Sequence, residues 1–136
     1  MSKKNDDFFV EKKPWSEVKD QLLGCYLKPY VAKILHTRKP LVYVDCFAGK
    51  GKFDDGKQGS PLIALDIIQQ GLISSKMSGH LQIAAAFIDL NYADDLRVNL
   101  KDYPGVKIVS GAYEDKIGEL LKNKGGCNVF LYIDPY

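Results

Sequence analysis

The chain has 136 residues, of which 46% are hydrophobic, and this is enough apolar surface for the core of one domain. Its 19 basic and 17 acidic residues give a formal charge of +2, which does not by itself indicate a nucleic-acid or membrane partner. The amino terminus is polar where a signal peptide is apolar, and no run approaches the roughly 18 apolar residues of a membrane span. We therefore expect a soluble, cytoplasmic protein with no membrane partner.

The three cysteines, Cys25, Cys46 and Cys127, lie far apart in the sequence. They form no Cys-x-x-Cys pair and no cluster with the two histidines, so no metal site is predicted. An odd number of cysteines without a disulfide framework is typical of a reducing compartment.

Residues 1–40 are expected to form a leader followed by a helical region. The first 14 residues are predicted to be mobile, although Phe8, Phe9 and Val10 form an apolar group that we expect to dock onto another surface. A helix is predicted from Ser16 onward, with Pro29 either kinking it or dividing it in two. Side chains at helical spacing along one face are expected to pack in the core: Trp15, Val18, Leu22, Tyr26, Tyr30 and Ile34.

Residues 41–53, LVYVDCFAGKGKF, are the stretch from which a ligand site is predicted. An apolar run with β-branched residues ends at Asp45, and the small-residue turn Ala48-Gly49-Lys50-Gly51 follows. This pattern is typical of a buried strand that leads into a tight loop. Open α/β sheets bind their ligands at the carboxyl ends of such strands.

The rest of the chain repeats this strand and helix pattern. Ser60 and Pro61 predict a helix start as N-cap and first helical residue, and Gly71 a stop. Further strands are predicted over residues 81–88, 106–109 and 129–133. Helices are predicted after Asn91, carrying Leu96 and Leu100, and over residues 114–122. Three of the four strands end on an aspartate: Asp45, Asp89 and Asp134.

This order predicts an α/β fold with a doubly wound parallel sheet. A sheet of this kind normally continues beyond four strands, and an apolar last strand would be left as an unpaired edge. We therefore expect residues 41–136 to be the N-terminal half of a longer Rossmann-like domain.

Two common nucleotide motifs do not match the loop. In the dinucleotide fingerprint G-x-G-x-x-G the third glycine would stand at Asp54, and the best helix start comes only at Ser60. The phosphate-binding pattern G-x-x-x-x-G-K-[ST] fails because Gln58 follows Gly56-Lys57.

A nucleoside with a positively charged tail suits the loop better, and S-adenosylmethionine has this chemistry. Asp45 can attract a cation or an amino group, and Asp89 can accept two ribose hydroxyls. Residues 111–113 are expected beside the adenine, and residues 134–136 are expected to face the transferred methyl group. The predicted cofactor-binding residues are Asp45, Phe47, Gly49, Gly51, Asp89, Gly111, Ala112 and Tyr113.

The chain resembles the three-Cys-motif partner protein family across essentially its whole length, through the segments FFVEKKPWSEVKDQLL, YLKPY, YVDCFAGKGKF, GSPLIAL, FID and YIDPY. The resemblance implies a Rossmann-type S-adenosylmethionine-dependent methyltransferase that works with a radical-SAM-like partner protein. By position, Asp45, Gly49 and Gly51 match the first methyltransferase motif, Asp89 matches the ribose-binding acid, and residues 134–136 match the catalytic loop.

Two departures from similar sequences bear on the cofactor and the acceptor. Lys50 stands where similar loops often have proline, which adds a positive charge near a cationic cofactor. The tetrapeptide [DN]-P-P-[YF] of amine-methylating enzymes is one proline short, so a nucleobase amine is only suggested as the acceptor. In that reaction the catalytic residues would be Asp134 accepting from the amine, Pro135 setting the backbone and Tyr136 stacking on the base.

Two alternatives stay open. The chain could be a non-catalytic, methyltransferase-like scaffold that docks a partner through Phe8, Phe9, Val10 and the helix beginning near Trp15. Nucleic acid could also be a partner, because lysine and arginine are concentrated in the first half of the sequence, although acidic residues are interspersed among them.

Overall fold

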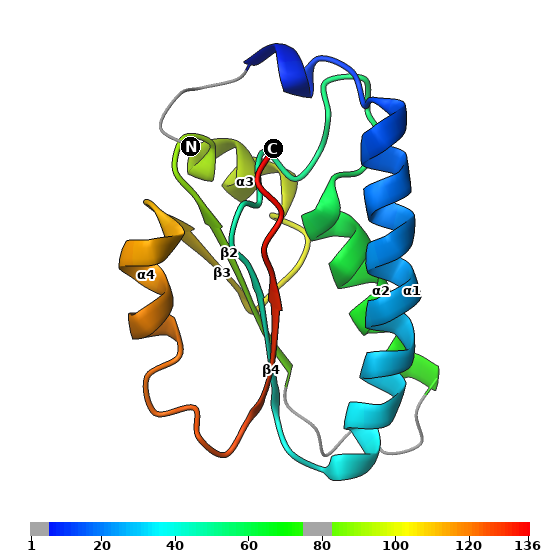
Figure 1. Ribbon diagram of the computed structural model, residues 1–136, viewed down its shortest axis with the longest axis vertical. Helices are drawn as coiled ribbons and strands as arrows, with labels where there is room; N and C mark the ends of the chain where they lie inside the picture. The colour runs from blue at the N-terminus through cyan, green and yellow to red at the C-terminus, as the bar shows by residue number, and fades with distance from the viewer. Residues whose placement is uncertain (1–5, 75–82) are drawn as a thin grey trace.

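The computed structural model describes residues 6–74 and 83–136, which form a four-stranded parallel sheet between helices. The strands are β1 (Leu41–Asp45), β2 (Ile83–Asp89), β3 (Val106–Ser110) and β4 (Asn128–Tyr132), in the order β3-β2-β1-β4. All three pairings are parallel, which confirms the predicted α/β, doubly wound fold. Figure 1 shows the carboxyl ends of the strands, the short helix of residues 6–9 and the C-terminus of the chain at the same end of the molecule.

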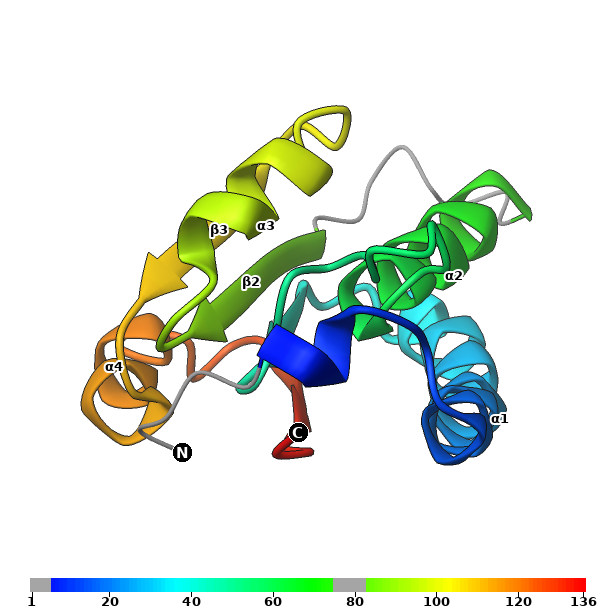
Figure 2. The ribbon, with the colours of Figure 1, turned by 90° about the horizontal axis from the view of Figure 1, so that it is seen from above.

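Both faces of the sheet are covered, as the apolar sequence of β1 requires, and every residue of β1 is buried. Leu41 and Tyr43 face one hydrophobic core, which also includes residues of α1 (Pro14–Thr37), α2 (Ser60–Ser74) and α3 (Ala93–Asn99). Val42 and Val44 face a second core, completed by α4 (Tyr113–Leu120). Figure 2 shows α1 and α2 on one side of the sheet and α4 on the other.

The helix α1 continues through Pro29, so of the two predicted outcomes, a kink or a division, the division into two short helices is wrong. Proline removes an N–H from the helix and crowds the carbonyl of the residue four positions earlier, here Cys25. Both Pro29 and Cys25 are exposed, so water can reach the carbonyl that loses its partner.

The apolar face predicted for the core is mostly exposed. The side chains of Trp15, Val18, Leu22 and Tyr26 are 54–71% exposed. A second set with the same helical spacing faces the sheet instead: Leu23, Leu27, Val31, Ile34 and Leu35. Only Ile34 belongs to both sets, and helical periodicity alone does not tell which apolar face packs inward.

Gly71 lies inside α2 rather than ending it. A Cβ at this position would lie 2.7 Å from the Cγ1 atom of Val31, which is buried on α1. The glycine therefore allows α1 and α2 to approach each other, and the helix ends three residues later, at Ser74.

The segment before α1 is packed, contrary to the predicted mobile leader; the first five residues lie outside the described part. A short 3-10 helix, η1 (Asp6–Phe9), buries the ring of Phe9 against Phe53 and Tyr92. The expected docking is therefore observed for Phe8 and Phe9, whereas Val10 is 55% exposed.

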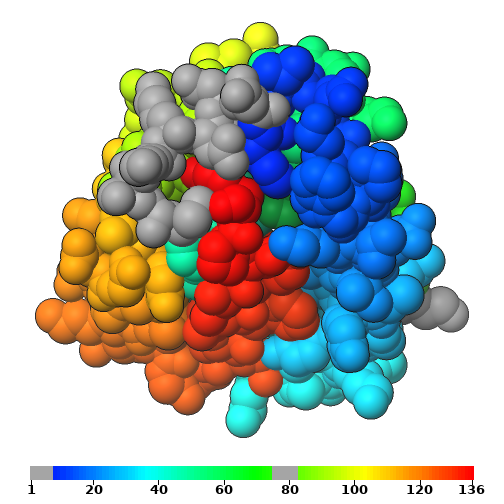
Figure 3. Space-filling model, turned by 45° about the horizontal axis from the view of Figure 1, so that its top comes forward, coloured from blue at the N-terminus to red at the C-terminus, as the bar shows by residue number. Residues whose placement is uncertain are grey.

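The edge of the sheet at β4 carries exposed apolar side chains, Val129, Leu131 and Ile133, each 36–51% exposed. Figure 3 shows this C-terminal segment at the surface between α1 and α4. No helix within residues 6–74 and 83–136 has both the length and the apolar character needed to cross a membrane.

Candidate functional site

The candidate site lies where the direction of strand order reverses. β2 and β3 follow β1 on one side, whereas β4 pairs with the other side of β1, so the carboxyl ends of β1 and β4 form the switch point. The loop after β1 is tied to both neighbours: the Cys46 N–H donates to the Tyr132 carbonyl and the Ala48 N–H to the Ile88 carbonyl, each at 2.9 Å. Segments far apart in sequence are thereby held in one place.

An open cavity of about 200 Å³ lies at the carboxyl ends of β1, β2 and β3. Its walls include five of the eight predicted cofactor-binding residues: Phe47, Asp89, Gly111, Ala112 and Tyr113. The rings of Phe47 and Tyr113 meet edge to face, with centroids 5.0 Å apart. We call this space the first cavity.

Asp89 is the acid of the first cavity, and it is buried. Its carboxylate accepts the backbone N–H groups of Gly49, Asn91 and Tyr92 at 2.8–3.0 Å. The residue that ends β2 thus fixes both the loop after β1 and the segment that leads into α3.

Asp45 lines neither this cavity nor the second cavity described below. It is completely enclosed and accepts the hydroxyl of Ser60 at 2.6 Å and the N–H of Phe47 at 3.2 Å. Burial raises the pKa of Asp45 to about 7, while these two hydrogen bonds act in the opposite direction. In this structure Asp45 connects β1, its loop and the start of α2, and it presents no oxygen to a ligand.

The two predicted loop glycines, Gly49 and Gly51, have left-handed backbone conformations and lie close to other parts of the chain. Gly49 has φ +68°, and the ring of Phe9 lies 2.7 Å from where its Cβ would be. Gly51 has φ +82° and lines the second cavity. Lys50 is directed away from both cavities: its Nζ lies 3.6 Å from the Asp54 carboxylate and 5.4–5.7 Å from the ring centroids of Tyr92 and Phe9.

Tyr136 lines both cavities. Its hydroxyl donates to the Asp89 carboxylate, with distances of 2.7 and 2.9 Å to the two oxygens. Its ring packs against Phe8, Phe9 and Tyr92, with centroids 5.0–6.1 Å apart. Tyr136 is one of the predicted site residues, but nothing in the sequence indicates that the aromatic residues of η1 cover it.

The second cavity, of about 50 Å³, lies between the start of α1 and the loop after β1. Of the three predicted catalytic residues, Asp134 and Tyr136 line it, whereas Pro135 is exposed and lines neither cavity. Asp134 accepts the Nζ of Lys19 at 3.0 Å and the hydroxyl of Tyr132 at 3.2 Å.

Helix α1 contributes a second carboxylate, Asp20, to this cavity, which sequence analysis missed. Asp20 forms an ion pair with Lys12, and both side chains are largely buried. Burial raises the pKa of Asp20, and the contact with Lys12 acts against that rise. Lys12 also binds the loop, through its Nζ to the Gln58 carbonyl and through its N–H to Asp55.

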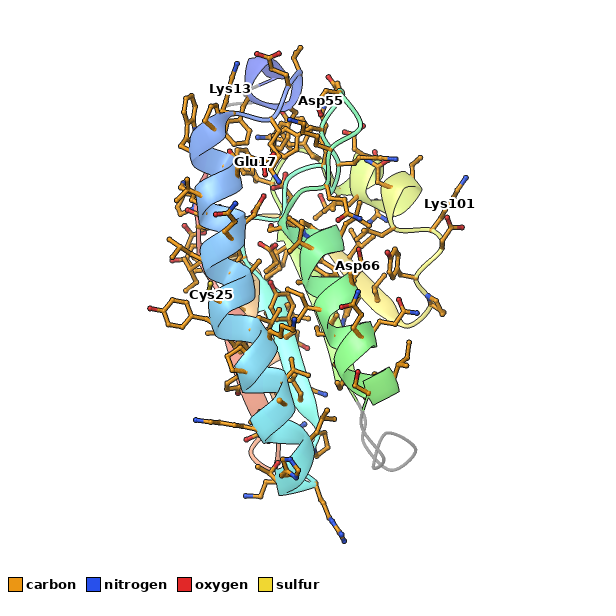
Figure 4. The ribbon with its side chains drawn as sticks, turned by 90° about the vertical axis from the view of Figure 1, so that its right-hand side faces the viewer. Lys13, Glu17, Cys25, Asp55, Asp66 and Lys101 are labelled. Carbon is orange, nitrogen blue, oxygen red and sulfur yellow. The ribbon has the colours of Figure 1, made fainter. Side chains whose placement is uncertain are left out.

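Figure 4 shows Lys13, Glu17 and Asp55 at the end of the molecule where η1, α1 and this loop meet. Lys57 of the loop lies 3.8 Å from Glu17 of α1. Charged side chains therefore tie residues 12–20 to the loop after β1 beside the second cavity.

Within the described ranges, no three or more His, Cys, Asp or Glu residues gather as a metal site would require. Comparisons of the chain with protein-family models, curated proteins and solved structures found no match. The family resemblance, the cofactor and the partner protein stay predictions.

Proposed function

We propose that this chain is an S-adenosylmethionine-dependent methyltransferase whose cofactor occupies the first cavity. One observation carries the proposal: Phe47, Asp89 and residues 111–113 lie at the ends of three different strands, and they line one cavity there.

The residues fit the chemistry of such a cofactor. Asp89 is a buried acceptor suited to ribose hydroxyls, and Phe47 and Tyr113 offer aromatic surface to a planar base. Gly111 has φ +142°, and its N–H donates a hydrogen bond to the Asp89 carbonyl at 3.0 Å. This bond fixes the turn that follows β3. When bound, S-adenosylmethionine would supply a sulfonium methyl group to an acceptor.

The second cavity is the proposed acceptor side, because it shares Phe47 and Tyr136 with the first cavity. Asp134 would accept a hydrogen bond from the acceptor amine, and could take its proton, once Lys19 shares or releases the carboxylate. Orientation by such contacts supplies much of the acceleration in a transfer of this kind. At about 50 Å³ this cavity holds a few water molecules, so a ring-bearing acceptor needs the aromatic wall to move.

The proposal is tested by titrating S-adenosylhomocysteine into the protein in a calorimeter. Ala112 lines the first cavity, and Ala112→Leu would fill part of it without removing a hydrogen bond described above. Gly118→Leu adds a leucine side chain to α4, the helix that follows Ala112, at an exposed position with no neighbour within 4 Å. We expect binding by the unmodified protein and by Gly118→Leu, and at least tenfold weaker binding by Ala112→Leu. Absence of binding by the folded, unmodified protein would overturn the proposal.

A second candidate function is favoured by the exposed apolar face of α1. Trp15, Val18, Leu22 and Tyr26 form a surface suited to a protein partner, such as the radical-SAM-like protein implied by the resemblance. Phe8 and Phe9 would not belong to that surface, because they pack inside the chain. A scaffold has no need of the cofactor, so the same titration separates the two functions.

Nucleic acid stays a proposal for the acceptor. Several of the lysines that suggested it form ion pairs within the chain: Lys12, Lys19, Lys50 and Lys57. A nucleic-acid acceptor would bind through the remaining basic side chains, and its affinity would fall steeply as salt is raised.

A further inference from the structure

Asp89 has little acceptor capacity left for a ligand. Its Oδ1 accepts the Gly49 N–H at 2.9 Å and the Tyr136 hydroxyl at 2.7 Å. Its Oδ2 accepts the N–H groups of Asn91 and Tyr92 at 3.0 and 2.8 Å and lies 2.9 Å from the same hydroxyl. A carboxylate offers about four acceptor positions, so these donors saturate it. Three of them are backbone groups that fix the loops, and the fourth is a side chain.

The surroundings of Tyr136 hold its hydroxyl in this position. Phe8 stacks on its ring with centroids 5.7 Å apart, and Phe9 meets it edge to face at 5.0 Å. Burial raises the pKa of the Tyr136 phenol, and the hydrogen bond to Asp89 raises it further. The phenol therefore keeps its proton near neutral pH and remains a donor to the carboxylate.

We propose that Tyr136 is a gate on the cofactor site: its hydroxyl occupies an acceptor position of Asp89 that the ribose needs, and the cofactor binds only after Tyr136 leaves. This inference rests on the proposed function. Because Tyr136 is part of the wall of both cavities, its departure also enlarges the space on the acceptor side. Cofactor binding and the opening of the acceptor cavity would then be one coupled event.

If Tyr136 is a gate, it weakens the affinity of the protein for the cofactor. The cofactor binds only the open state, in which Tyr136 has left Asp89. Its apparent dissociation constant is therefore the intrinsic one divided by the fraction of protein in that state. A hydrogen bond to a charged acceptor changes such an equilibrium about tenfold or more. Removing the hydroxyl while keeping the ring should therefore tighten binding by about that factor.

The test compares Tyr136→Phe with Tyr132→Phe by calorimetric titration of S-adenosylhomocysteine. Tyr132 is a matched control, because it is also half-buried in the second cavity and its hydroxyl binds Asp134 rather than Asp89. We expect binding about tenfold tighter for Tyr136→Phe and within twofold of the unmodified protein for Tyr132→Phe. Thermal unfolding of each variant establishes that it is folded.

Equal or weaker binding by folded Tyr136→Phe would overturn the gate and leave the proposed function intact. Binding by none of the three proteins would overturn both. The rate of association gives a second measurement: stopped-flow mixing should show a faster association for Tyr136→Phe. The substitution Phe8→Ala, which removes the stacked ring but no hydrogen bond to Asp89, should show a smaller gain in the same direction.

Discussion

The hydroxyl of Ser60 donates to the Asp45 carboxylate at 2.6 Å, and this contact joins the end of β1 to the first turn of α2. Sequence analysis assigned Ser60 to a helix cap and Asp45 to a ligand. In the structure the two side chains are hydrogen-bonded to each other. A carboxylate enclosed in this way depends on few partners, so its ionisation should affect the stability of the fold.

Stability should fall as the pH rises through the titration of Asp45. Its pKa is about 7 in the folded protein against an ordinary value of 3.8, so the folded state binds the proton more tightly. The stabilising contribution is complete below about pH 4 and is lost as the pH rises through 7, amounting to about 4 kcal/mol at most. Urea unfolding of the protein between pH 4 and 8 measures this loss.

Asp45→Asn is the control for that prediction. An amide can accept the Phe47 N–H and donate to Ser60, so both contacts persist without a charge. The difference in unfolding free energy between the variant and the unmodified protein should change in the variant's favour as the pH rises from 4 to 7. Parallel pH profiles for the two proteins would contradict this assignment.

Removing one partner of the Lys12–Asp20 ion pair should be costly. The side chains of Lys12 and Asp20 are only 4% and 13% exposed, so if one is removed, the charge of the other is poorly solvated. We expect Asp20→Leu to lower the free energy of unfolding by about 3 kcal/mol, and the double change with Lys12→Met to recover most of it. The exposed pair Arg97–Asp94 is the comparison, and Asp94→Ala should cost less than about 1 kcal/mol. A similar cost for both single changes would contradict the buried role.

Two helical glycines should respond in opposite directions to alanine. In Gly71→Ala the new Cβ would meet Val31 at 2.7 Å, and such overpacking costs about 1–3 kcal/mol. In Gly118→Ala the Cβ meets nothing within 4 Å, so helix propensity should stabilise the protein by about 0.5–1 kcal/mol. Denaturant unfolding of both variants checks the prediction. Gly71→Ala should also be rescued in part by Val31→Ala, and no rescue would argue against this contact.

Two leucines on different faces of α1 should differ sharply in what their truncation costs. Leu22 is 54% exposed and Leu27 is fully buried, and they belong to the two apolar faces of the helix. Leu27→Ala should cost about 2–5 kcal/mol, and Leu22→Ala should stay within about 0.5 kcal/mol. Equal losses would show that the exposed face is covered in the folded protein.

Much of the fold could be predicted because its signals are local. Apolar runs that end on Asp45 and Asp89 gave the strands, and their alternation with helices gave a parallel sheet. The errors came from contacts between distant segments. Nothing in the sequence near Gly71 indicates that Val31 will lie against it, and nothing in α1 shows which of its apolar faces packs inward.

The site was predicted unevenly for the same reason. Residues that follow strand ends, such as Phe47, Asp89 and Tyr113, were brought together because the topology places all strand ends at one edge. Asp20 was missed because it lies on a helix far from any loop motif. The contact of Tyr136 with Asp89 depends on how the segment after β4 turns back, which has no local signal.

The most direct test of the account is a crystal structure of the protein with S-adenosylhomocysteine. We expect the adenine beside residues 111–113, a ribose hydroxyl on Asp89, and the Tyr136 hydroxyl displaced from that carboxylate. A complex in which the ribose lies away from Asp89, or in which saturating ligand leaves the first cavity empty, would contradict it.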